Sequence, residues 1–160
     1  MEPNLGLSQS SRSAVCDLLN VLLSDEYLLY TKTRNFHWNV NGPHFPDYHK
    51  FFETQYEALD VIVDDMAERV RELGGVPAAT LAGFLKRATL REAPVGLLGS
   101  KEMVTTLLTD HEALIRSLRR DADSCAEVHH DAGTNDFLVG LVEQHEKMAW
   151  MLRASLEGKG

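Results

Sequence analysis

The chain is poor in cysteine and has no long apolar run. Its 160 residues include only Cys16 and Cys125, which lie far apart and belong to no Cys-x-x-Cys or Cys/His cluster, so we expect two free or partly buried thiols. No segment approaches the roughly 20 apolar residues of a membrane span. Residues 1–12 lack the hydrophobic stretch of a targeting signal. These absences argue against a cysteine-bound metal cluster and a membrane-spanning helix, and we expect a cytoplasmic protein.

Basic residues are scarce as well. Lys and Arg number 16 against 24 Asp and Glu, which gives a formal net charge of −8. Nucleic-acid binding depends largely on Lys and Arg that meet phosphates. Neither end of the chain is rich in them, because residues 1–12 carry only Arg12 and the C-terminus only Lys159. We therefore predict weak or absent DNA binding, whereas the acidic balance suits the handling of cations.

Strand patterns, internal repeats and low-complexity tracts are also missing, whereas helical patterns are strong. The apolar content of 44% and charged content of 25% are ordinary for a globular domain. The Asn-Gly-Pro sequence at 41–43 and the Gly-Gly pair at 74–75 break the helical pattern. Long helices are predicted over residues 10–36, 46–73, 100–127 and 134–157, and a shorter one over 80–90.

This order of helices predicts an all-α fold, a ferritin-like four-helix bundle with a short crossover helix between its second and third long helices. A chain of this length forms one domain that buries about 70% of its unfolded surface. We expect a short extension over residues 1–9, the bundle over 10–157 and a tail over 158–160.

The helix predicted over 46–73 carries two stripes of side chains. One is apolar and predicts a buried face: Phe52, Tyr56, Leu59, Val63, Met66 and Val70. The other is acidic: Glu53, Glu57, Asp60, Asp64 and Glu68. A solvated face is the simplest interpretation of the acidic stripe. However, no Lys or Arg interrupts it, and His49 stands four residues before its first carboxylate. A bound metal would relieve the repulsion.

Helix geometry divides these candidate ligands into two groups. At about 1.5 Å of rise per residue, Glu53 and Asp64 lie roughly 16 Å apart, so one ion cannot contact both. If two copies of the helix pack antiparallel about a two-fold axis, His49 and Glu53 of one chain meet Asp64 and Glu68 of the other. His37 ends the preceding helix, and a short loop returns the chain close to His49. The sequence therefore predicts two equivalent sites in an isologous dimer.

Several motifs of the chain agree in spacing with one known family. They are His37-Trp38-Asn39-Val40, Gly42, His49, Asp64, Met66-Ala67-Glu68-Arg69 and Leu73-Gly74-Gly75. The chain resembles the Dps family of mini-ferritins, the DNA-binding proteins from starved cells, over nearly its whole length. In that family the ferroxidase centre lies at a two-fold interface, with two His and one carboxylate from one subunit and two carboxylates from its neighbour.

The resemblance implies a ligand for each family position. The first set is His37, His49 and Glu53, and the second is Asp64 and Glu68. The family usually has Asp where this chain has Glu53, and the extra methylene changes the reach of that ligand.

The resemblance also implies an activity. Imidazole and carboxylate ligands suit Fe(II) but also Zn(II), which should inhibit. We expect a ferroxidase with Fe(II)/Fe(III) as its metal, about two ions in each inter-subunit site and Glu68 as the bridge. Hydrogen peroxide is the expected oxidant, and Fe(III) mineralises inside a hollow homododecamer built through two-fold and three-fold interfaces. Such a protein would protect against iron and peroxide.

Three further residues have both a simple and a functional interpretation. Trp38 follows a proposed ligand and either packs at the helix end or relays electrons. Asp131 and Asp136 flank the start of the last helix, where acids usually stabilise the N-terminus. By family resemblance this region lines three-fold pores that draw Fe(II) inward, and Asp136 is the better candidate.

Other sites and functions remain open. A di-iron centre inside the bundle needs a Glu-x-x-His pair on each of two helices, and the chain has one match, Glu127 to His130, at a helix end. His111 and His145 lack matching partners, so we expect them at the surface or in support of a site. Trp150 is expected in the core or at a subunit interface. The alternative function is a non-catalytic shell-forming or adhesion protein whose metal centre is impaired by Glu53.

Overall fold

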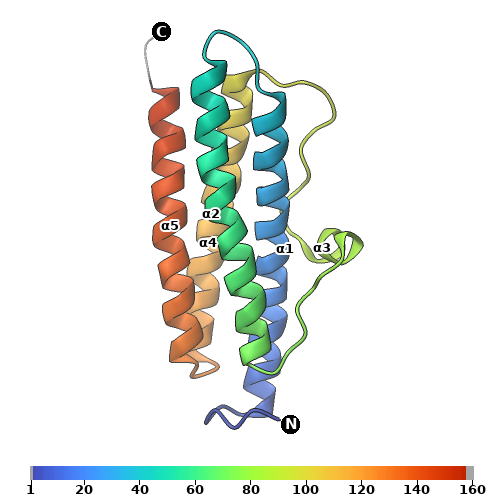
Figure 1. Ribbon diagram of the computed structural model, residues 1–160. Helices are drawn as coiled ribbons and strands as arrows, with labels where there is room; N and C mark the ends of the chain where they lie inside the picture. Colours follow the sequence, from blue (N-terminus) through green and yellow to red (C-terminus); the bar gives the residue numbers. More distant parts are fainter. Residues whose placement is uncertain (1, 158–160) are drawn as a thin grey trace.

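The protein is a bundle of four long helices with one short helix outside it. The computed structural model describes residues 2–157, so the predicted tail over 158–160 lies outside the described residues. The helices are α1 (Gln9–Asn39), α2 (Phe45–Glu72), α3 (Leu81–Arg87), α4 (Ser100–Glu127) and α5 (Ala132–Leu156). The described part contains no strand. In Figure 1 the long helices lie side by side and α3 lies outside them, beside α1. The predicted all-α, ferritin-like bundle with a crossover helix is confirmed.

Side-chain caps explain where two of the helices begin. The hydroxyl oxygen of Ser8 accepts a hydrogen bond from the N–H of Ser11, so α1 begins at Gln9. Asp131 accepts from the N–H of Thr134, so α5 begins two residues earlier than predicted. The end of α1 also differs from the prediction. It continues three residues beyond Phe36, because the first breaker after Phe36 is the Asn-Gly-Pro sequence at 41–43.

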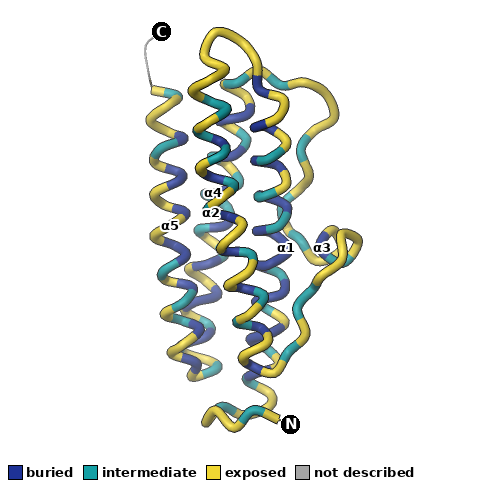
Figure 2. The backbone as a smooth tube through the Cα atoms, viewed as in Figure 1, coloured by how far each residue is buried: buried dark blue, intermediate teal, exposed yellow. Residues whose placement is uncertain are grey.

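The core runs along the inner faces of the long helices, where the buried residues of Figure 2 gather. On α2 the buried face is rotated slightly from the predicted stripe. Gln55 and Ile62 are buried there, whereas Tyr56 and Val63 are only partly buried. Cys16 and Cys125 are free and buried, as predicted. Burial raises the pKa of the Cys125 thiol to about 11.

Trp150 of α5 is less buried than expected. Trp150 is 61% exposed, so its predicted place in the core is wrong, whereas a place at a subunit interface stays a prediction. No helix in residues 2–157 is long and apolar enough to cross a membrane.

A polar cluster lies in the centre of the bundle. Glu26 of α1, His111 of α4 and His145 of α5 each have 0% of their surface exposed. His145 places its Nδ1 2.9 Å from His111 Nδ1 and its Nε2 2.9 Å from Glu26 Oε1. The expectation that the two histidines lie at the surface is wrong. His111 stands between the buried residues Leu107 and Leu114 at helical spacing, so α4 turns its ring inward.

The buried His111 makes the fold sensitive to acid. Burial, and then the neighbouring His145, hold the pKa of His111 well below its usual value of 6.5. In the unfolded chain this ring takes up a proton near pH 6.5, whereas in the fold it stays neutral, so the stability that it contributes is present above pH 6.5 and is lost as the pH falls.

We expect the free energy of unfolding of the metal-free protein to fall between pH 7.5 and pH 5.5, by up to about 1.4 kcal/mol per pH unit from this ring. Urea titrations monitored by circular dichroism measure it. In a His111→Gln variant the free energy of unfolding should depend less steeply on pH. A His44→Gln variant, which changes an exposed loop residue, should keep the wild-type dependence. Equal slopes in all three proteins would contradict this assignment.

Candidate metal centre

Two histidines meet where α1 ends and α2 begins. The rings of His37 and His49 stack with centroids 3.8 Å apart. His37 Nδ1 lies 2.7 Å from the backbone oxygen of His49, and His49 Nδ1 lies 2.9 Å from that of His37. A carbonyl oxygen only accepts, so each Nδ1–H donates. Both Nε2 atoms therefore carry a free lone pair, and the hydrogen bond on the far nitrogen orients each ring as in protein metal sites.

Glu53 follows His49 by one helical turn, but its carboxylate is not free. Lys50, three residues earlier on α2, forms an ion pair with it. The hydrogen bond from Lys50 holds the pKa of Glu53 below its usual value, and the same contact raises the pKa of Lys50. The sequence pattern missed this contact, because Lys50 precedes the acidic stripe rather than interrupting it. A metal would have to displace an exposed ammonium group from Glu53.

Asp64 and Glu68 lie apart from the histidine pair. Both are exposed residues of the same continuous helix, so the estimate of about 16 Å from Glu53 to Asp64 applies to this structure. Within residues 2–157, no three His, Cys, Asp or Glu side chains of one chain gather closely enough to hold a metal ion. The structure therefore brings His37 and His49 together, places Glu53 near them and leaves Asp64 and Glu68 elsewhere.

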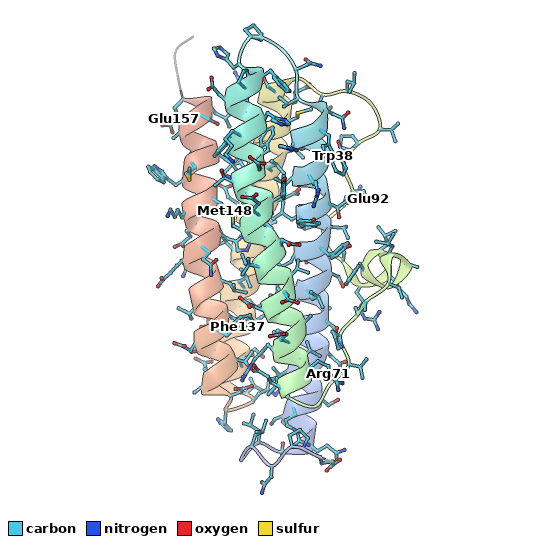
Figure 3. The ribbon with its side chains drawn as sticks, in the orientation of Figure 1. Trp38, Arg71, Glu92, Phe137, Met148 and Glu157 are labelled. Carbon is cyan, nitrogen blue, oxygen red and sulfur yellow. The ribbon has the colours of Figure 1, made fainter. Side chains whose placement is uncertain are left out.

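Tyr56 connects His37 to a cluster of aromatic side chains around Arg34. Tyr56 meets the His37 ring edge-on, with centroids 5.1 Å apart. Arg34 lies over three rings, at 4.9 Å from Tyr56, 5.4 Å from Trp38 and 5.7 Å from Tyr30. Trp38 is 66% exposed at the end of α1 (Figure 3), so it does not pack in the core. The spacing of four residues along α1 could have predicted this cluster.

The two acids near the start of α5 differ in their surroundings. Asp131 is buried and accepts hydrogen bonds from the hydroxyl of Thr134 at 2.6 Å and from Arg69 at 3.3 Å. Its carboxylate is fully used as a helix cap, which favours the simple interpretation over a role in a pore. Asp136 is exposed, and its place in a pore stays a prediction.

Comparisons with known proteins identify the family of the fold. Residues 16–158 match the ferritin-like domain. An uncharacterized low temperature-induced protein of Nostoc is 47% identical over 156 residues, which cover 98% of this chain and 87% of the relative. The DNA protection during starvation protein of Brevibacillus brevis is 39% identical over 94% of this chain and 100% of its own length.

A solved structure shows the same fold. It is a Dps protein from Vibrio cholerae, described as a member of a broad superfamily of ferritin-like diiron-carboxylate proteins. It is 29% identical to this chain, covers 98% of both chains and superposes with a TM-score of 0.91. The bundle, the histidine pair and these relatives together show that the chain belongs to the Dps family of ferritin-like proteins.

Proposed function

We propose that the protein is an iron-storage and detoxification ferroxidase that oxidises Fe(II) with hydrogen peroxide at sites shared between two subunits. The observation that carries this proposal is the histidine pair, whose two Nδ1–H groups are engaged by backbone carbonyls and whose Nε2 atoms are free. Neutral imidazole nitrogens beside carboxylates suit Fe(II). Because residues 2–157 of one chain bring no three His, Cys, Asp or Glu side chains together for a metal, we infer that a second chain completes the site.

An antiparallel pair of α2 helices would supply the missing ligands. His37, His49 and Glu53 of one subunit then face the carboxylates of Asp64 and Glu68 of the partner subunit, and the reverse holds at the second site. Val61, 60% exposed in the middle of α2, lies between the two groups of ligands and offers apolar surface for this contact. The site would be incomplete in a monomer.

The residues would act by binding two Fe(II) ions and one peroxide. Each Fe(II) gives one electron, so that two Fe(II), one hydrogen peroxide and two protons yield two Fe(III) and two water molecules. Glu68 is the candidate bridge between the ions, and pairing the two electrons avoids hydroxyl radical. Trp38 follows His37 in the chain and its ring lies under Arg34, and we propose that this tryptophan supplies or accepts an electron. Fe(III) would then mineralise inside a homododecamer, and the exposed Asp136 is the candidate for its three-fold pores.

Stopped-flow oxidation of Fe(II) tests the activity. The protein should consume about two Fe(II) per peroxide, and Zn(II) should inhibit it. Native mass spectrometry should show twelve subunits, and an iron core should appear after repeated additions of Fe(II). A rate equal to that of Fe(II) and peroxide in buffer would contradict the proposal.

The ion pair between Lys50 and Glu53 favours one alternative, a non-catalytic shell-forming or adhesion protein of the same fold. Lys50→Met separates the two functions. If Lys50 only competes with iron, the variant should oxidise subsaturating Fe(II) a few-fold faster, because exposed ion pairs are weak. Arg71→Met, which removes an exposed cation near the other end of α2, is the control. A wild type and a variant that are both inactive would favour the alternative.

DNA binding is expected to be weak or absent. The net charge of −8 opposes contact with phosphates, and residues 1–12 carry only one basic residue, Arg12. A mobility-shift experiment at moderate salt and low Mg²⁺ should leave duplex DNA unretarded, and retardation there would overturn this prediction. The cytoplasm is the proposed location, with iron and peroxide as substrates.

A further inference from the structure

The centre of the bundle contains every buried side-chain polar atom that lacks a hydrogen-bond partner in the described part of the chain. There are five such atoms: both oxygens of Glu26, Oε1 of Gln55, and Nε2 of His111 and of His145. They belong to four residues, one from each long helix. Buried polar atoms without partners are rare and costly, so a group of them needs a physical explanation.

The contact between Glu26 and His145 is close but is not a hydrogen bond. His145 Nε2 lies 2.9 Å from Glu26 Oε1, yet both atoms remain without a hydrogen-bond partner because the N–H would not point at the oxygen. Two ligands of one cation, each about 2.1 Å from it, are about 3.0 Å apart when they lie at right angles, as in an octahedral site. In that arrangement the metal, rather than the oxygen, lies along the lone pair of the nitrogen. The separation of 2.9 Å is therefore compatible with two ligands of one octahedral ion.

His111 supports His145 from the other side. Its Nδ1 lies 2.9 Å from His145 Nδ1, so that His145 can donate its Nδ1–H to His111 while its Nε2 faces Glu26. Metal-bound histidines usually make such a contact with their second nitrogen. Gln55 lies about one helical turn along α5 from this pair, because its Nε2 donates to the backbone oxygen of Met148, which is three residues beyond His145 and is labelled in Figure 3.

We propose that the interior of each subunit binds one divalent transition-metal ion through Glu26 and His145, with His111 orienting His145. Apart from His111, which contacts His145 rather than the ion, no further His, Cys, Asp or Glu among the described residues joins this pair, so water must fill the remaining positions. The nitrogen and oxygen ligands favour Zn²⁺, Co²⁺ or Fe²⁺ over Mg²⁺ or Ca²⁺. This site is separate from the interfacial centre and does not depend on the proposed ferroxidase activity.

A proton is the competing occupant. Shared between Glu26 and His145, it would form a neutral buried ion pair without a metal. All three cluster residues are completely buried, so a metal would enter during folding or when the bundle opens locally. An experiment must therefore load the protein both by equilibration and by refolding.

Cobalt binding distinguishes the two occupants. The test protein is a chelator-treated His37→Ala/His49→Ala variant, in which the interfacial histidines are absent. It is refolded or equilibrated with Co²⁺ and dialysed. We expect about one Co²⁺ per subunit, a visible d–d absorption band and displacement by Zn²⁺. Adding Glu26→Gln or His145→Gln should weaken binding by at least about 10- to 100-fold. The control is Glu112→Gln, which changes a surface carboxylate paired with Arg153 and should leave Co²⁺ binding unchanged.

Anomalous scattering at the cobalt edge provides a second measurement that needs no core variant. A peak between Glu26 and His145 in the His37→Ala/His49→Ala protein supports the proposal. Absence of bound Co²⁺ after both loading procedures, a peak only elsewhere, or unchanged binding in a folded Glu26→Gln variant would overturn it and leave the shared proton as the explanation.

Discussion

Replacing His37 and His49 together by alanine should abolish the catalysed oxidation of Fe(II) by peroxide. Both free Nε2 atoms of the half-site are lost, and no other histidine of the described chain lies in contact with this pair to replace them. Loss of a residue that merely supports a metal ligand typically costs 10- to 100-fold, so loss of two ligands should lower the rate at least ~100-fold. Stopped-flow absorbance of Fe(III) formation measures the effect.

The control is His44→Ala. His44 is an exposed histidine of the loop that joins α1 to α2, and its side chain makes no capping hydrogen bond. Its loss should leave the rate unchanged, while circular dichroism and native mass spectrometry check the fold and assembly of all variants. A His37→Ala/His49→Ala protein that assembles and oxidises Fe(II) at the wild-type rate would refute the proposed site.

Two inactive variants should restore activity when they assemble together. One is His37→Ala/His49→Ala, and the other is Asp64→Ala/Glu68→Ala. In a dimer of one variant with the other, one of the two sites receives intact histidines from one subunit and intact carboxylates from its partner. Random pairing makes half of the dimers mixed, so about a quarter of the wild-type sites should be recovered.

Refolding the two variants together and separately, with the same rate measurement, tests this sharing. Each variant refolded alone is the control for residual activity. A mixture that is no more active than its components would show that the site is not shared between subunits. A di-iron centre within one bundle would give that result, and its activity would also survive disruption of the two-fold contact. Recovery would support both the shared site and the antiparallel arrangement of α2.

Most of the fold follows from patterns within single helices. The apolar period and the breakers predicted all five helices to within about three residues, because caps and breakers act on neighbouring residues. The detailed rotation of α2 did not follow, since Tyr56 and Val63 are as apolar as their buried neighbours. Which apolar residue faces the core depends on what packs against the helix, and that information lies in other helices.

The candidate site, like the fold, depends partly on local sequence patterns and partly on contacts between helices. The sequence alone determined that the acidic positions lie on one helix and are too far apart for one ion, because rise per residue is a property of any α-helix. Only the tertiary structure decided how His37 and His49 orient each other, because these contacts depend on side-chain directions at the junction of α1 and α2. The ion pair between Lys50 and Glu53 is local, since the two residues are three apart on α2, and helical spacing could have predicted it.

The buried cluster depends most on tertiary structure. Glu26, His111 and His145 are separated by 34 or more residues and share no motif, so no local pattern marks them. They meet because α1, α4 and α5 turn particular faces toward one axis, and that rotation is set by the packing of whole helices. The sequence alone therefore determined the helices and the spacing of the carboxylates, whereas contacts between helices decided which polar groups the protein buries.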